Sequence, residues 1–185
     1  MLVCAIGGIK THRRQKLNLE TMQPSLSYFT PDGVLLERHK LNDHQLSIRH
    51  LSVTNDDTVY FAQQHQNPLG VMEPLLYEHQ LGMTPKPLVA NEQQWLEFEG
   101  YIGSVVASQE FILASSPKRG IVGVFERKSG TLAHLLRETD VCGIAMHNER
   151  FALSSGLGKL GVDTLTSHGL SHNLNLAWDN HLVWL

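Results

Sequence analysis

Short apolar runs separated by polar turns recur along the chain and predict an all-β protein. Four of these runs align with one another at Leu51, Val105, Ile144 and Leu182, which lie 54, 39 and 38 residues apart. Each of the first three runs is followed by a polar turn and then by three more strand-like runs. Four short strands at a period of about 40–45 residues are typical of one β-propeller blade. We therefore expect a β-propeller, with a β-sandwich as the alternative.

The strands of a blade are lettered here from A, the innermost, to D, the outermost, and the register shows how much of each blade is present. The predicted runs are B, C and D strands at 2–8, 25–30 and 34–41, complete A–D units at 47–90, 101–138 and 142–177, and a lone A strand at 179–185. This pattern predicts a single domain over residues 1–185 with about four blades. The last A strand either pairs with residues 2–8 and closes a four-bladed ring, or the chain is an open arc of a larger propeller. We favour the open arc, with the chain as the carboxyl half of that propeller.

Composition narrows the classes of function. The chain has 185 residues, with 15 Lys and Arg against 18 Asp and Glu, and a net charge of −3. A binder of nucleic acid or of an anionic membrane needs a broad basic field, so we expect neither. A membrane-spanning helix needs about 20 consecutive apolar residues, and the sequence contains no such run. Two cysteines are too few for a disulfide-dense mini-protein, and their spacing does not match that of a zinc site.

The lengths of the connections indicate where a binding site lies. In a propeller the B–C and D–A connections share one face, and the long connections here are 9–24, 65–74 and 91–100. All three belong to that face, which we call the long-loop face. Rigid scaffolds carry binding residues on such loops, so we expect the site there.

Polar residues at equivalent repeat positions supply the candidate site. Arg49 and His50 begin one A strand, Asn180 and His181 occupy the same position in the last A strand, and the 9–24 loop is basic. The candidate ligand-binding residues are Lys10, His12, Arg49, His50, Asp179, Asn180 and His181. The imidazoles of His50 and His181 could bind a metal ion, with Asp179 orienting His181, while Arg49 binds a carboxylate. In the alternative interpretation the two histidines hydrogen-bond to neighbouring blades as structural residues, and the basic loop is simply solvated.

The other chemistry-bearing residues carry no recognisable motif. No HExxH pair, GxSxG elbow, Walker loop or Rossmann fingerprint is present. We predict that the histidines scattered on outer strands and turns face solvent, namely His39, His79, His134, His147, His168 and His172. Gly103 and Gly143, at matching positions of two A strands, are predicted to be glycine because space is least there.

Several words of the sequence resemble a known family. They are GGIKTH at 7–12, KLNLETMQPSL at 16–26, HQLSIRHL at 44–51, YIGSV at 101–105, VCGIA at 141–145 and WDNHL at 178–182. They resemble a bacterial family of YVTN/WD40-like β-propellers of unknown function, encoded in iron-uptake clusters beside imelysin-like and di-haem thiol-oxidoreductase-like proteins. The resemblance implies an exported, periplasmic protein of about twice this length. It supplies no catalytic residues.

We therefore expect a periplasmic propeller that serves as a binding module in iron or metal handling. Its long-loop face would contact a protein partner of an iron-uptake system or a small ligand. The alternatives are a redox or metal-dependent enzyme with its site at the channel, and a structural scaffold. The sequence identifies no cofactor, although a metal ion remains possible.

Overall fold

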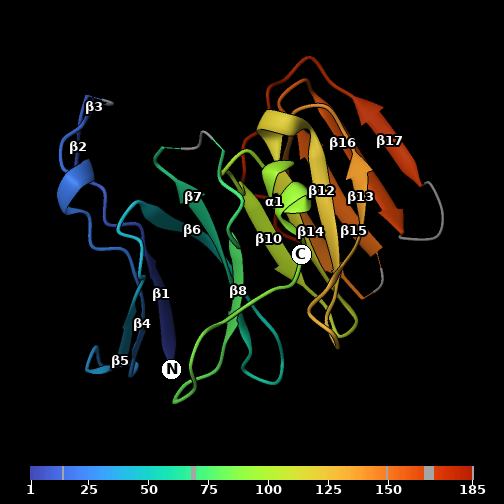
Figure 1. The fold of residues 1–185 in the computed structure, drawn as a ribbon. Helices are drawn as coiled ribbons and strands as arrows, with labels where there is room; N and C mark the ends of the chain where they lie inside the picture. Colours follow the sequence, from blue (N-terminus) through green and yellow to red (C-terminus); the bar gives the residue numbers. More distant parts are fainter. Residues whose placement is uncertain (14, 68–69, 149, 165–168, 185) are drawn as a thin grey trace.

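In the described part of the chain, four antiparallel sheets of three or four strands follow one another, and a two-stranded hairpin stands beside them (Figure 1). The computed structural model describes residues 1–13, 15–67, 70–148, 150–164 and 169–184. The first sheet has three strands and each of the next three has four, always in sequence order. The strands are β1 (Leu2–Ile6), β4 (Ser25–Phe29) and β5 (Leu35–Lys40); β6 (Leu46–Val53), β7 (Val59–His65), β8 (Leu76–His79) and β9 (Lys86–Pro87); β10 (Ser104–Ala107), β11 (Phe111–Ser116), β12 (Ile121–Glu126) and β13 (Leu132–Arg137); and β14 (Val141–His147), β15 (Arg150–Ser155), β16 (Lys159–Thr164) and β17 (Leu170–Asn173).

The sheets are arranged as blades of an open propeller arc. The inner strands of successive sheets contact one another, β1 with β6, β6 with β10 and β10 with β14. The first and last sheets lie at opposite ends of the arc (Figure 1). Among the described residues, β1 pairs only with β4, so a four-bladed ring closed through β1 is not formed. The predicted propeller fold and the predicted strand order are confirmed.

The strand bounds depart from the predicted repeat at two places. The D strand predicted within 84–90 is reduced to the two residues of β9, because Pro85 and Pro87 have no N–H to donate to a ladder. Val89 instead forms a parallel bridge with Thr131 of the next sheet. Residues 179–184 form no β-ladder with a neighbouring strand. The lone A strand predicted at 179–185 is therefore not found in its described part.

The long connections contain small elements of their own. The 9–24 connection folds into a hairpin of β2 (Thr11–His12) and β3 (Gln15–Lys16), followed by a 3-10 turn, η1 (Leu19–Thr21). A second 3-10 turn, η2 (Pro117–Arg119), joins β11 to β12. The 91–100 connection contains the helix α1 (Glu92–Leu96), which begins with a reciprocal capping box. No described helix has both the length and the apolar character that crossing a bilayer requires.

Polar side chains join the inner strands from blade to blade. Ser47 Oγ donates to the carbonyl of Gly7 at 2.8 Å. The backbone N–H of Val105 donates to His50 Nδ1 at 3.2 Å, and that of Ile144 donates to Ser104 Oγ at 3.3 Å. Each bond satisfies a backbone group or a buried side chain at the surface between two sheets.

The segment 178–184 crosses the inner side of the arc. The carbonyl of Asp179 accepts a hydrogen bond from Ser154 Oγ at 3.4 Å. The ring of Trp184 stacks on His147 at 5.7 Å, and the ring of His181 stacks on His50 at 5.6 Å. The carboxyl end of the chain therefore contacts both the second and the fourth sheet.

This segment also explains why glycine occurs at two A-strand positions. A Cβ built on Gly143 would lie 3.0 Å from Leu182 Cβ and 3.0 Å from Ser154 Oγ. A Cβ on Gly103 would lie 3.2 Å from Asn180 Oδ1. The space is limited by the crossing segment as well as by the convergence of the blades.

Replacing Gly143 with Val is expected to lower the free energy of unfolding by about 1–3 kcal/mol, because the larger side chain overpacks this contact. Urea denaturation followed by fluorescence measures the change. In a Ser154→Ala background the cost should be smaller, because Ala removes Oγ, one of the two atoms nearest to the added side chain. An unchanged midpoint in the single variant would show that residues 179–182 do not pack on β14.

Candidate metal centre

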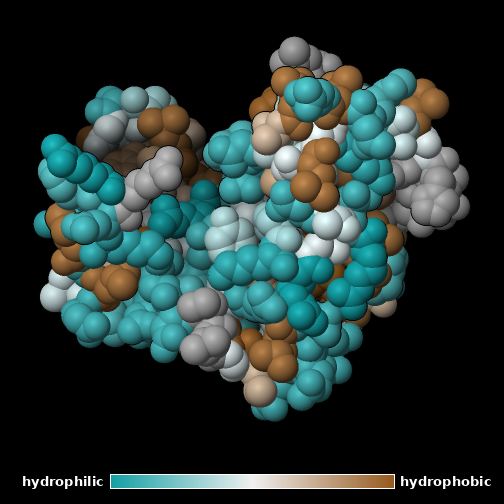
Figure 2. Space-filling view, turned by 90° about the horizontal axis from the view of Figure 1, so that it is seen from above, coloured by the Kyte–Doolittle hydropathy of each residue, from teal (hydrophilic) through white to brown (hydrophobic). Residues whose placement is uncertain are grey.

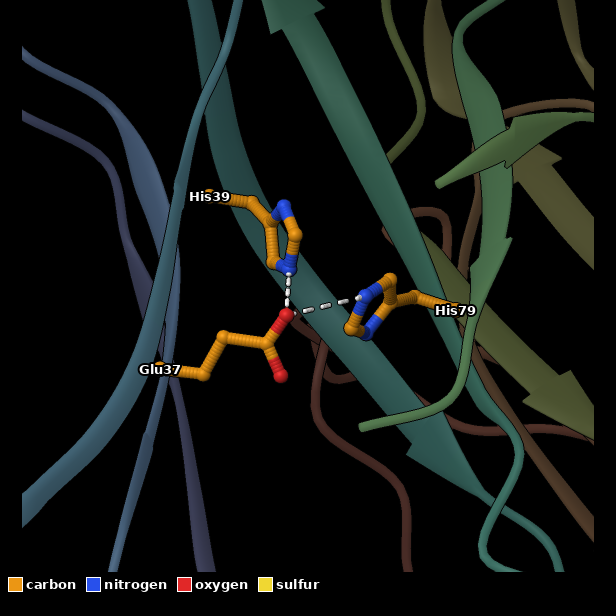
Figure 3. A group of neighbouring side chains, drawn as sticks. All are labelled: Glu37, His39 and His79. Atoms are coloured by element: carbon orange, nitrogen blue, oxygen red, sulfur yellow. Dashed lines mark hydrogen bonds and ion pairs between the residues drawn. The ribbon is translucent and has the colours of Figure 1, made fainter. Parts of the chain in front are cut away.

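Two histidines and a carboxylate converge between the first two sheets (Figure 3). Glu37 and His39 lie two residues apart on β5, so their side chains project from the same face of that strand. His79 ends β8 of the next sheet and points toward them. We call these three residues the outer centre, because they lie on outer strands rather than at the channel.

The ligand atoms of the outer centre lie close enough to share one ion. Glu37 Oε1 contacts His39 Nε2 and lies 3.9 Å from His79 Nε2. The two imidazole rings are 4.3 Å apart, and all three ligand atoms lie within 4.8 Å of one another. The His79 side chain is fully buried, whereas those of Glu37 and His39 are 22% and 24% exposed.

Neighbouring groups hold two of these side chains in place. The backbone N–H of Gly82 donates to the other carboxylate oxygen of Glu37 at 2.7 Å. The hydroxyl of Tyr28 lies 2.5 Å from His79 Nδ1, and the carbonyl of Met83 lies 2.7 Å from His79 Nε2. Such partners fix the orientation of metal ligands, and removing one typically weakens metal binding about 10–100-fold.

The protonation states suit a metal ligand set. The Gly82 N–H bond, opposed in part by burial and aided by His39, holds the pKa of Glu37 below its usual value. Burial lowers the pKa of His79, so its imidazole is neutral at pH 7. Burial and the charge of Glu37 raise the pKa of Tyr28, so the phenol keeps its proton. A metal site needs an ionised carboxylate and neutral imidazoles, and Glu37 and His79 meet these two conditions.

The hydrogen bonds around His79 are compatible with coordination. A carbonyl can only accept, so Nε2 carries the ring proton and Nδ1 accepts from the Tyr28 hydroxyl. An ion bound at Nε2 moves the proton to Nδ1, and the Tyr28 oxygen can then accept it, because a hydroxyl both donates and accepts. The Met83 carbonyl would then lose its donor from His79. Two His and one carboxylate form a ligand set found in Zn²⁺ and Fe²⁺ sites that keep open positions.

The prediction that His39 and His79 face solvent is therefore wrong. The repeat pattern identified their strands but not the face against which the neighbouring sheet packs. Glu37 and His39, spaced for one strand face, were the signal that could have drawn attention to the centre. His134, His147 and His172 are exposed as predicted, and His168 lies outside the described residues.

The structure brings together two of the residues predicted from the repeat, His50 and His181, whose rings stack. His50 Nδ1 accepts the Val105 N–H, which is the structural role considered for it in the alternative interpretation. Whether the pair also binds a metal ion remains a prediction. The carboxylate of Asp179 accepts the N–H of Asn180 at 2.7 Å, and no described bond links that carboxylate to the His181 ring.

The side chains of Lys10, His12 and Arg49 make no described hydrogen bond, ion pair or ring contact with this pair. Lys10 and His12 belong to the 9–24 connection, where their side chains are exposed. Arg49 is also exposed and forms no ion pair among the described residues. No hydrogen bond, ion pair or ring contact between described residues joins His12 to His50 or His181, and the four-residue cluster at the channel mouth stays a prediction.

The environment of His50 predicts a dependence of stability on pH. Burial, and secondly the charge of His181, lower the pKa of His50. The unfolded chain therefore binds a proton at His50 more readily than the folded chain does. This contribution to stability is fully present above about pH 6.5 and is lost as the pH falls toward the lowered value.

We expect His50→Asn to lose less stability than the wild type between pH 7.5 and pH 5, because Asn keeps an acceptor for the Val105 N–H but does not titrate. Thermal unfolding at both pH values measures the difference. Equal losses in the two proteins would contradict the prediction, since all other titrating groups are shared.

Comparison with known proteins identifies the family but gives no activity. No curated protein matches the sequence. Among solved structures, glutaminyl cyclase from Myxococcus xanthus aligns with a TM-score of 0.47 and 7% sequence identity, over 78% of this chain. The chain spans 59% of the length of that enzyme. The family model described as "Protein of unknown function (DUF1513)" matches residues 1–185, and the chain belongs to this family.

Proposed function

We propose that this chain is a metal-binding β-propeller module of an exported iron- or metal-handling system. The observation that carries the proposal is the outer centre, where two imidazoles and a carboxylate from adjacent blades meet with their supporting hydrogen bonds. The periplasmic location and the link to iron uptake rest on the resemblance of sequence words described above. The role of the long-loop face in contacting a protein partner rests on the lengths of its connections.

The geometry favours binding over catalysis as the role of the outer centre. Among the pockets found in the described part of the chain, the 370 Å³ pocket touches His79 but not Glu37 or His39. The side chain of His79 is fully buried against Tyr28. An ion held there would join strand β5 of the first sheet to strand β8 of the second, and would thereby stabilise the packing of the two blades by mass action.

Metal titration of the purified chain tests the proposal. The probes are Zn²⁺, and Fe²⁺ under anaerobic conditions, with the bound metal counted after dialysis. Glu37→Gln and His39→Gln should weaken binding by more than the roughly 10–100-fold expected for loss of a supporting group. Tyr28→Phe should weaken it within that range, because it removes a supporting group rather than a ligand.

His134→Gln is the matched control, since His134 is exposed on β13 and lies far from the outer centre in the sequence. It should bind both metals as the wild type does. Glu37→Gln keeps the shape of a half-buried side chain, so we expect this variant to fold. Its metal affinity can therefore be measured even where a variant of buried His79 fails to fold. Wild-type affinity in Glu37→Gln and His39→Gln would overturn the proposal.

A further inference from the structure

A second group of ligand-bearing side chains occurs on the long-loop face. Asp43 lies in the D–A connection between β5 and β6, His65 ends β7, and Glu73 lies in the connection that follows β7. His65 Nε2 lies 2.9 Å from Asp43 Oδ2 and 3.7 Å from Glu73 Oε1. The three ligand atoms lie within 4.8 Å of one another.

The burial of this group differs from that of the outer centre. The His65 side chain is 12% exposed, whereas those of Asp43 and Glu73 are 32% and 47% exposed. The imidazole is thus fixed in the protein, and the two carboxylates can be reached from solvent. Figure 2 looks onto the end of the molecule that carries the B–C connections, and its surface there is hydrophilic over most of its area.

Hydrogen bonds hold both ends of the group. The other oxygen of Asp43 accepts the backbone N–H of Gln45 at 2.8 Å. His65 Nδ1 accepts the backbone N–H of Asn67 at 3.0 Å. The first bond orients the Asp43 carboxylate, as a supporting group does around a metal ion. The second determines which nitrogen of the His65 ring carries the proton.

We propose that Asp43, His65 and Glu73 bind a second divalent cation on the long-loop face, independently of the outer centre. Two carboxylates and one imidazole make a harder ligand set than the two imidazoles and one carboxylate of the outer centre. Carboxylates favour Mn²⁺, whereas imidazoles favour Zn²⁺ and Cu²⁺. Mn²⁺ therefore discriminates between the two sites.

Coordination at this site has a consequence for the backbone. Because Nδ1 accepts from Asn67, the ring proton lies on Nε2 and is donated to Asp43. An ion bound at Nε2 moves that proton to Nδ1, where it opposes the N–H of Asn67. Cation binding thus breaks the Asn67 hydrogen bond, in contrast to the outer centre, where the Tyr28 hydroxyl accommodates either position of the proton.

The test uses the whole chain with Mn²⁺ alone, followed by electron paramagnetic resonance of the free ion. Binding should persist in Glu37→Gln and should weaken more than about tenfold in Asp43→Asn and in Glu73→Gln, a loss at the lower limit for disturbing a metal site. His44→Gln is the control, because His44 adjoins Asp43 but does not belong to the group. Wild-type Mn²⁺ affinity in both carboxylate variants, or no binding by the wild type, would overturn the proposal.

A second readout follows the backbone. In Glu37→Gln, with the outer centre disabled, saturating Zn²⁺ should shift the amide resonance of Asn67 and change the tautomer-sensitive nitrogen shifts of His65. An unshifted Asn67 resonance at saturation would overturn coordination through His65. These outcomes are independent of the outer centre, whose failure would appear instead as wild-type Zn²⁺ affinity in Glu37→Gln and His39→Gln.

Discussion

Replacing Trp95 with Ala is expected to lower the free energy of unfolding by about 3–5 kcal/mol, the usual cost of deleting a large buried aromatic side chain. Trp95 is 2% exposed and contacts the rings of Phe98 and Phe125 at 5.6 and 5.8 Å. These rings belong to the hydrophobic cluster between the second and third sheets. Chemical denaturation followed by circular dichroism measures the loss.

The control for this substitution lies on the same short helix. Gln93 is exposed, and Gln93→Ala should change stability by no more than about 0.5 kcal/mol. A loss below about 1 kcal/mol in Trp95→Ala would show that α1 does not anchor the second sheet to the third.

Replacing Arg127 with Ala is expected to lower the free energy of unfolding by about 2–4 kcal/mol. This is more than the loss of one charged hydrogen bond and less than the loss of one partner of a fully buried ion pair. The Arg127 side chain is 13% exposed and pairs with Asp56, whose side chain is 54% exposed. Its guanidinium also donates to Tyr60 Oη at 3.0 Å and to Gln109 Oε1 at 3.1 Å. One side chain thus joins the β6–β7 turn to the third sheet.

The cost of this substitution should depend on pH in a defined direction. Hydrogen bonds from Thr54 and then Arg127 hold the pKa of Asp56 well below its usual value. A lowered carboxyl pKa stabilises the fold above about pH 4, and the contribution disappears as the pH falls toward the lowered value. The difference between wild type and Arg127→Ala should therefore be constant from pH 5 to pH 8 and shrink in stronger acid.

Arg127→Lys separates charge from geometry, because Lys keeps the charge but cannot make the forked set of bonds. The free energy of unfolding of Arg127→Lys, measured by urea denaturation, should lie between those of the wild type and Arg127→Ala. Equal stability of Arg127→Ala and the wild type at pH 7 would contradict the assigned role.

The fold followed from the sequence because each blade repeats the same four-strand pattern, so Leu51, Val105 and Ile144 could be aligned on inner strands. Local chemistry that breaks the repeat was harder to predict. Pro85 and Pro87 shorten a strand that the period alone would make longer.

The candidate centre was less accessible from sequence for a physical reason. Glu37 and His39 reveal a shared strand face, but their partner His79 lies 40 residues further along the chain and on a neighbouring sheet. Only the packing of two blades, with Tyr28 buried beside His79, brings the three together. His50 and His181 did meet, but they meet because residues 178–184 cross the inner side of the arc and not because they hold equivalent positions on two inner strands.

The most direct test of the account is an anomalous difference map from crystals of the whole chain soaked with Zn²⁺. The account predicts a peak at the outer centre, about 2.0–2.2 Å from the ligand atoms of Glu37, His39 and His79. A map with no peak between these three side chains, at a zinc concentration that saturates the protein in solution, would contradict it.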